Sequence, residues 1–217
     1  MTTAARREQD AEGLRGAHLF CQQEMTGAER IDVAGGQLAV FSRGNPARER
    51  VNQDAAALLP VGKKRLVLVV ADGVGGARSG ARASSLAVEE ISRALAEACE
   101  GVPERELGGE LLRGAILNGI ERANAAVKAL GLGAGTTLAI VAIDEDRTMR
   151  TFHVGDSTVV VVGQRGRVKL QTVSHSPVGY AVEAGLIDDE DALHHPDLHL
   201  ISNMVGSERM RIEVGAR

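Results

Sequence analysis

The clearest element in the pattern of apolar and polar positions is a continuous apolar run from Leu66 to Ala71. The run ends on Asp72 and is followed by a cluster of glycines at positions 73, 75, 76 and 80. A short continuous apolar run is typical of a buried strand, and a strand that ends at a glycine-rich turn holds its last side chain rigidly at a sheet edge. We therefore expect Asp72 to be the residue around which a site is built.

Upstream of this strand the pattern predicts a hairpin and then a loop. Residues 31–42 read as two strands interrupted by Gly35-Gly36, a pair typical of a hairpin turn. Residues 44–54 form a loop rich in turn residues and arginine. Residues 1–29 have mixed charges and weak periodicity, so we expect a flexible lead-in there and one folded domain over residues 30–217.

Two long helices are predicted downstream. Apolar residues recur with helical spacing between Gly80 and Glu100, Ser79 is a candidate N-cap, and residues 101–103 contain the Gly and Pro that end a helix. A second helix is predicted over about residues 107–130. Its apolar stripe consists of Leu111, Leu112, Ala115, Ile116, Ile120 and Val127.

The last third of the chain is predicted to contain strands and then short helices. Residues 136–144, 148–154, 157–163 and 167–173 read as a meander of short antiparallel strands. Asp188 is a candidate cap for a short helix that ends near His194, and residues 209–217 begin another strand. This order of elements indicates an α+β sandwich in which the two long helices cover one face of a sheet.

Composition narrows the class of protein. Hydrophobic residues make up 44% of the 217 residues and charged residues 25%, as in soluble globular proteins. The net charge of −4 does not suggest a nucleic-acid partner, and no apolar stretch has the length of a membrane span or a signal peptide. Cys21 and Cys99 form no paired motif, which favours a reducing compartment. We expect a cytoplasmic protein, and the sequence leaves its oligomeric state open.

Three carboxylates next to predicted strand ends or turns carry the candidate chemistry. They are Asp54 in the segment NQD, Asp72 in ADGVGG and Asp156 in HVGDS. Clustered carboxylates suit hard cations such as Mg²⁺ or Mn²⁺, which activate water and neutralise charge on phosphoryl groups. The alternative is that each is a turn residue, because Asp-Gly and Gly-Asp are common in turns. The glycine cluster lacks the lysine and the spacing of a P-loop.

Taken in order, these segments resemble the metal-dependent protein phosphatases of type 2C (PPM serine/threonine phosphatases) in their bacterial form. The resemblance extends from about residue 31 to the end of the chain, and the ordered set is more specific than any one motif. The motifs are NQD at 52–54, DGVGG at 72–76 with GARAS at 80–84, GTTL at 135–138, HVGDS at 153–157 and SHS at 174–176.

The resemblance implies two packed antiparallel β-sheets flanked by α-helices, and a centre of two Mn²⁺ or Mg²⁺ ions with a third, weaker ion. Water activated by the ions attacks the phosphorus of a phosphoserine or phosphothreonine in a protein substrate, with no covalent phosphoenzyme. By family position Asp72 bridges the two ions and the Gly73 carbonyl binds one of them. Asp54 acts on the metals, and Asp156 serves the third ion.

The chain departs from the family pattern at several positions. The family's phosphate-binding arginine has two candidates, Arg48 and Arg50, which flank the expected position at Glu49. Val74 stands where many relatives have a histidine proposed as general acid, so water would protonate the leaving group. In addition, Thr158 replaces the usual arginine after GDS, and Ser174 replaces an aspartate.

The family pattern continues beyond Arg217 with an SDG motif and an Asp-Asn pair that supply two further metal ligands. The resemblance therefore implies a C-terminally incomplete domain that is inactive or nearly so by itself. Two functions stay open: a protein phosphatase whose sequence is cut short, and a pseudophosphatase that binds a phosphoprotein or regulator without turnover. A variant of the first acts on a partner-switching regulator of a sigma factor.

Overall fold

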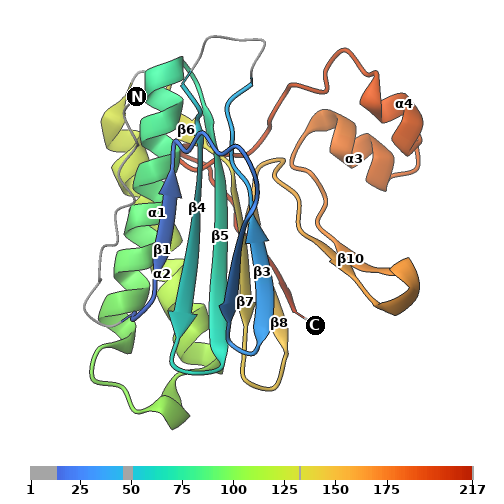
Figure 1. Ribbon diagram of the computed structural model, residues 1–217. Coiled ribbons are helices and arrows are strands. Elements are labelled where there is room, and N and C mark those ends of the chain that lie inside the picture. Colours follow the sequence, from blue (N-terminus) through green and yellow to red (C-terminus); the bar gives the residue numbers. More distant parts are fainter. Residues whose placement is uncertain (1–13, 46–50, 132, 217) are drawn as a thin grey trace.

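The computed structural model describes residues 14–45, 51–131 and 133–216, with the backbone alone for Ala77 and Ala216. An antiparallel sheet of seven strands forms the centre of this part of the chain (Figure 1). Its strand order is β1 (His18–Cys21), β4 (Asp54–Val61), β5 (Arg65–Val74), β7 (Leu138–Ile143), β8 (Met149–Val154) and β11 (Glu213–Ala216), with β6 (Gly135–Thr136) paired to the end of β5.

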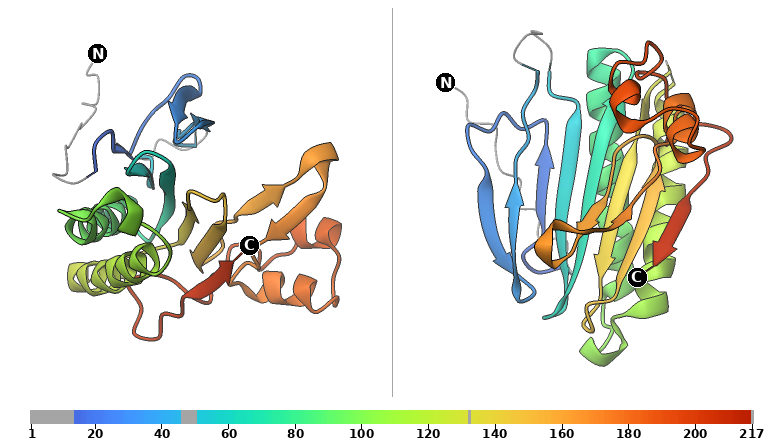
Figure 2. Two further views of the ribbon diagram at one scale, coloured as in Figure 1. Left: turned by 90° about the horizontal axis from the view of Figure 1, so that it is seen from below. Right: turned by 90° about the vertical axis from the view of Figure 1, so that its right-hand side faces the viewer.

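Two long helices cover one face of the sheet. α1 (Ala77–Cys99) and α2 (Gly109–Leu130) lie side by side there, joined through the short 3₁₀ helix η1 (Glu104–Glu106) (Figure 2). Side chains alternate between the two faces of a strand, so every second residue of β4 and β5 reaches the helices. These residues are Ala55, Ala57, Leu59, Val61, Val67, Val69 and Ala71, and all of them are buried in the main core.

A hairpin covers part of the opposite face. β2 (Glu29–Val33) and β3 (Gly36–Val40) pair with each other and pack over a smaller core around Phe20, Leu58 and Leu66. The fold is thus a mixed α+β arrangement with antiparallel sheets, as the pattern predicted. Within the described residues, the second sheet facing the main one is this two-stranded hairpin.

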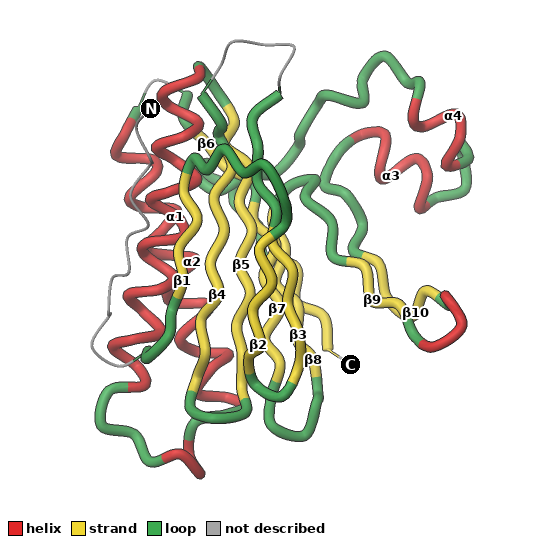
Figure 3. Tube along the Cα trace, in the orientation of Figure 1, coloured by secondary structure: helices red, strands yellow, loops and turns green. Residues whose placement is uncertain are grey.

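A second hairpin and two short helices stand away from the main sheet (Figures 1 and 3). β9 (Val160–Val162) and β10 (Val168–Gln171) flank the 3₁₀ helix η2 (Gln164–Gly166), and α3 (Pro177–Glu183) and α4 (Asp189–Leu193) follow. The predicted four-strand meander is therefore split, with β7 and β8 in the main sheet and β9 and β10 outside it. The predicted cap of α4 is confirmed, because the Asp188 carboxylate accepts a 2.8 Å hydrogen bond from the Asp191 amide.

Two predictions of local structure are wrong. His18–Cys21, which we assigned to a flexible lead-in, forms β1 on the edge of the main sheet, because Leu14, Ala17 and Phe20 are buried there. Residues 1–13 of that lead-in lie outside the described residues. The first helix begins at Ala77 with Gly76 as its N-cap, so Ser79 lies inside the helix.

Among the described residues, no helix combines the length and the apolar character that a membrane span requires.

Two glycines of α2 allow a matched test of the helix packing. A methyl group at Gly119 would lie 2.9 Å from the Cα of Ile91 in α1, whereas one at exposed Gly114 would meet no atom within 4 Å. We expect Gly119→Ala to destabilise the protein by about 1–3 kcal/mol through overpacking. Gly114→Ala should stabilise it by about 0.5–1 kcal/mol through helix propensity. Urea unfolding of both variants measures the two effects, and equal shifts of the same sign would contradict this packing.

Candidate metal centre

The register of β4 and β5 places Asp54 directly opposite Asp72. Both side chains belong to the set that points away from the helices, because Leu58 and Leu66 in the same alternation pack under the β2–β3 hairpin. The hairpin ends short of this pair, and a cavity of about 430 Å³ opens there. The described residues that line it are Arg43, Gly44, Asn45, Val51, Asn52, Gln53, Asp54, Asp72 and Gly73.

The two carboxyl groups are partly buried, share a hydrogen bond and repel each other. Partial burial, followed by the negative charges of Asp54 and Asp156, raises the pKa of Asp72 to about 6. Burial also raises the pKa of Asp54, although a hydrogen bond with Asp72 works in the opposite direction. This bond favours a proton on Asp72 and the charge on Asp54, the usual response of two carboxylates that share one site.

Asn52 fixes the turn that delivers Asp54. Its side chain is 3% exposed and donates hydrogen bonds to the Gln23 carbonyl at 2.6 Å and to the Ser42 hydroxyl at 2.9 Å. Its own side-chain oxygen accepts the Asp54 amide at 2.9 Å. The segment NQD therefore supplies both the Asp54 carboxylate and the Asn52 side chain that holds the backbone of Asp54.

The glycines after Asp72 allow a close contact between β5 and α1. A methyl group on Gly73 would lie 2.1 Å from the Gly80 carbonyl oxygen and 2.9 Å from that of Gln53. The Gln53 carbonyl accepts the Gly73 amide at 3.1 Å and the Ser84 hydroxyl at 2.5 Å. The motif around Gly80 and Ser84 thus holds the chain on both sides of the acidic pair.

Two threonines hold the backbone of Asp72. The Thr137 amide and the Thr136 hydroxyl both donate to the Asp72 carbonyl at 2.9 Å, and the Thr137 hydroxyl accepts the Asp72 amide at 3.1 Å. The same Thr137 hydroxyl lies 2.6 Å from that of Ser157, the neighbour of Asp156. The sequence identified the GTTL segment as part of the motif set but did not reveal that it links two of the three aspartates.

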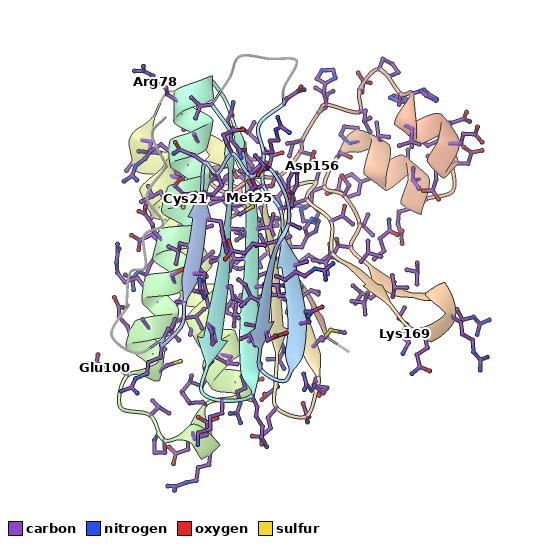
Figure 4. The ribbon with its side chains drawn as sticks, in the orientation of Figure 1. Cys21, Met25, Arg78, Glu100, Asp156 and Lys169 are labelled. Carbon is purple, nitrogen blue, oxygen red and sulfur yellow. The ribbon has the colours of Figure 1, made fainter. Side chains whose placement is uncertain are left out.

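All three predicted aspartates therefore gather at one end of the sheet, where Asp156 is labelled in Figure 4. Arg48 and Arg50, our candidates for binding phosphate, lie outside the described residues. Arg43 lines the cavity beside Asp54 and Asp72, and sequence reasoning overlooked it. Arg43 lies eleven positions before Asp54 in the sequence, so spacing alone gave no signal.

The donor set fits hard divalent cations. Carboxylate and backbone carbonyl oxygens are the ligands that Mg²⁺ and Mn²⁺ prefer. The pKa of Asp72 is raised first by burial and then by the charges of Asp54 and Asp156, and a bound cation would favour the ionised carboxylates. Asp54, Asp72 and the Gly73 carbonyl would hold ions at the cavity, with Asp156 at its side.

The burial of Asp72 and its repulsion by Asp54 predict a stability gain from removing its charge. Because the folded state raises the pKa of Asp72 from 3.8 to about 6, the folded protein binds more protons than the unfolded chain between these values, so stability is lost as the pH rises through this window. Asp72→Asn should therefore raise the free energy of unfolding of the metal-free protein at pH 7.5. The gain should shrink toward pH 4. Urea unfolding in EDTA measures it, and Asp32→Asn on the exposed hairpin serves as the control. A pH-independent difference would contradict this assignment.

Comparisons with known proteins indicate the family of this chain. The family model described as Protein phosphatase 2C matches residues 43–208. A Streptococcus pyogenes protein named as a putative protein phosphatase 2C-type is 33% identical over 150 residues, which are 66% of this chain and 58% of that protein. This chain thus spans less than two thirds of the length of that relative.

Solved structures show the same fold. The S. agalactiae serine/threonine phosphatase superposes with a TM-score of 0.63 at 26% identity, over 93% of this chain and 74% of that one. The catalytic domain of the protein phosphatase PstP, described in complex with two manganese ions, has a TM-score of 0.56 at 24% identity, over 93% and 72% of the two chains. With a family match over most of its length, a shared fold and an acidic pair that suits hard cations, the chain belongs to the protein phosphatase 2C family.

Proposed function

We propose that this protein is a metal-dependent serine/threonine phosphatase that hydrolyses phosphoserine or phosphothreonine in a protein substrate. The observation that carries the proposal is the pairing of Asp54 with Asp72 across β4 and β5 at the floor of the cavity. Relatives named as serine/threonine phosphatases support the reaction class, and a fold shared with a manganese-bound phosphatase supports the metal.

The residues at the cavity have two roles: some would bind the metal, and others orient the residues that bind it. Divalent ions, when bound, supply activation of water for direct attack on phosphorus and neutralise charge on the phosphoryl group. Asp72 and Asp54 would hold the ions at the cavity, and Thr136 and Thr137 keep Asp72 in place through its backbone. Val74, next to this pair, offers no proton, so water protonates the leaving oxygen.

Arg43 is our candidate for binding the substrate phosphate. It lines the cavity together with both aspartates, and its side chain is exposed to solvent. A guanidinium group binds phosphate through two parallel hydrogen bonds and keeps its charge at every physiological pH. Arg48 and Arg50 remain candidates by family position.

The cytoplasmic location and the phosphoprotein substrate remain predictions.

The central test measures metal binding on this chain and turnover on a product that also carries the SDG and Asp-Asn motifs of the family. We expect Mn²⁺ to raise the melting temperature of the chain, because a ligand that binds the folded state stabilises it, and to support release of phosphate from a phosphothreonine peptide by the longer product. Both effects should disappear with EDTA or in Asp72→Ala. Asp32→Ala, on the exposed hairpin, is the control and should keep both.

Each other outcome selects a different function. Turnover that survives EDTA and Asp72→Ala contradicts the metal mechanism. Binding of Mn²⁺ and of the phosphopeptide without turnover supports the pseudophosphatase, for which Thr158 in place of the usual arginine is the motivating observation. The absence of Mn²⁺ binding rejects the metal-dependent phosphatase.

Arg43 is tested by charge removal. We expect Arg43→Ala to weaken binding of the phosphopeptide by about tenfold or more, since charge-assisted hydrogen bonds contribute on the order of 1.5–3 kcal/mol, while Arg43→Lys keeps part of the affinity. Arg30→Ala, on an exposed hairpin strand, is the matched control. If Arg48→Ala or Arg50→Ala weakens binding and Arg43→Ala does not, the phosphate is held by the family position instead.

A further inference from the structure

A second group of polar side chains lies behind the Gly155–Asp156 turn. His153 of β8, His175 and Glu213 of β11 bring one nitrogen or oxygen each within 4.8 Å of one another. The two imidazole rings pack with centroids 4.5 Å apart. Neither ring nitrogen of buried His153 has a hydrogen-bond partner within the described part of the chain, and burial lowers its pKa, so this ring is neutral at physiological pH.

The surroundings of His175 select one tautomer. Its Nδ1 accepts the Gly155 amide at 3.1 Å and faces the side-chain nitrogen of Asn203 at 2.9 Å. The orientation of that amide is set independently, because the Asn203 oxygen accepts the Arg211 amide at 3.1 Å. With two donors on Nδ1, the ring hydrogen is on Nε2, where it donates to the Glu213 carboxylate at 3.1 Å.

This tautomer excludes a metal site at the cluster. A cation bound through Nε2 needs the lone pair of that atom and leaves the hydrogen of a neutral ring on Nδ1. The Nδ1 hydrogen would then face the Gly155 amide hydrogen. Glu213 and His175 are therefore better explained as a hydrogen-bonded chain that ends on the backbone of Gly155, with the His153 ring packed against the His175 ring.

His175 satisfies both backbone groups of Gly155. Its ring accepts the Gly155 amide, and its own amide donates to the Gly155 carbonyl at 2.8 Å. Gly155 has a φ of 103°, and a methyl group there would lie 2.7 Å from Thr137. The turn that carries Asp156 is thus held between Thr137, which binds Asp72, and His175.

We propose that His175, oriented by Glu213, is a positioning residue that sets the place of Asp156 relative to Asp72. Glu213 holds Nε2–H, so Nδ1 stays an acceptor and fixes the Gly155 amide, and the next residue presents its carboxylate toward the acidic pair. The Ser202 amide and hydroxyl bind the His175 carbonyl at 2.9 and 2.8 Å, which anchors the other side of the histidine. This inference rests on the proposed metal role of Asp156.

Two substitutions of His175 test the contributions of its two ring nitrogens one at a time. In His175→Asn the side-chain oxygen takes the place of Nδ1, so the Gly155 contact is kept and the Glu213 contact is lost. In His175→Gln the side-chain nitrogen reaches toward Glu213, and the acceptor for Gly155 is lost. Mn²⁺ binding is measured by calorimetry, together with the metal-free melting temperature. We expect His175→Gln to weaken the Asp156-dependent ion by about tenfold or more, as loss of an outer hydrogen-bond partner does, with the Asp72-dependent ion unchanged. His175→Asn should stay closer to wild type.

A double-mutant cycle with Asp156→Asn distinguishes positioning from general destabilisation. If His175 acts through Asp156, His175→Gln has no further effect on Mn²⁺ affinity once Asp156 is replaced. An equal loss at both ions, or an additive loss in the double variant, overturns the inference. If Asp156→Asn itself leaves Mn²⁺ binding unchanged, the proposed metal role of Asp156 fails instead.

The tautomer is tested on the wild-type protein, which removes dependence on the folding of any variant. Nitrogen-15 NMR of metal-free protein labelled at histidine should show His175 with its hydrogen on Nε2 at pH 7.5. In Glu213→Gln this hydrogen loses its carboxylate acceptor, and its exchange with water should become faster. A hydrogen on Nδ1 of His175 in the wild type contradicts the proposed chain of hydrogen bonds.

Discussion

The antiparallel register between β4 and β5 is the constraint on which the site depends. It sets Asp54 opposite Asp72, on the face away from the helices, and the same alternation buries the alanines, valines and leucines that hold the strands in place. A shift of one residue in either strand would turn the carboxylate of that strand toward α1 and its apolar side chains outward. The core and the acidic pair are therefore specified by one pattern, and the core stabilises a register that forces two negative charges together.

The surrounding residues hold the backbone of the acidic pair by neutral contacts. Asn52 binds the Asp54 amide, and Thr137 binds both backbone groups of Asp72. Among the described residues that line the cavity, Arg43 is the positively charged one, and no ion pair to either aspartate is present in this part of the chain. The carboxylates thus keep their capacity for a cation, while burial and, after it, repulsion raise the pKa of Asp72.

Segments far apart in the chain meet at the third aspartate. Thr137 contacts the Gly155–Asp156 turn from the side of β5, and His175 holds it from the side of β11. The C-terminal strand therefore reaches the acidic pair through a histidine and a glycine amide, without a direct contact. This arrangement explains the role of the SHS segment: its central residue, His175, contacts the Gly155–Asp156 turn.

The sequence by itself determined the elements and the three aspartates. Continuous apolar runs and helical stripes identified the strands and both long helices, and the ordered motifs identified the family, because these signals depend on neighbours in the chain. Only the tertiary structure showed β1 in the sheet, Arg43 at the cavity and the hydrogen bonds of Thr137 and His175. These contacts join residues separated by tens of positions, and their geometry is set by the packing of the whole domain, which no local pattern records.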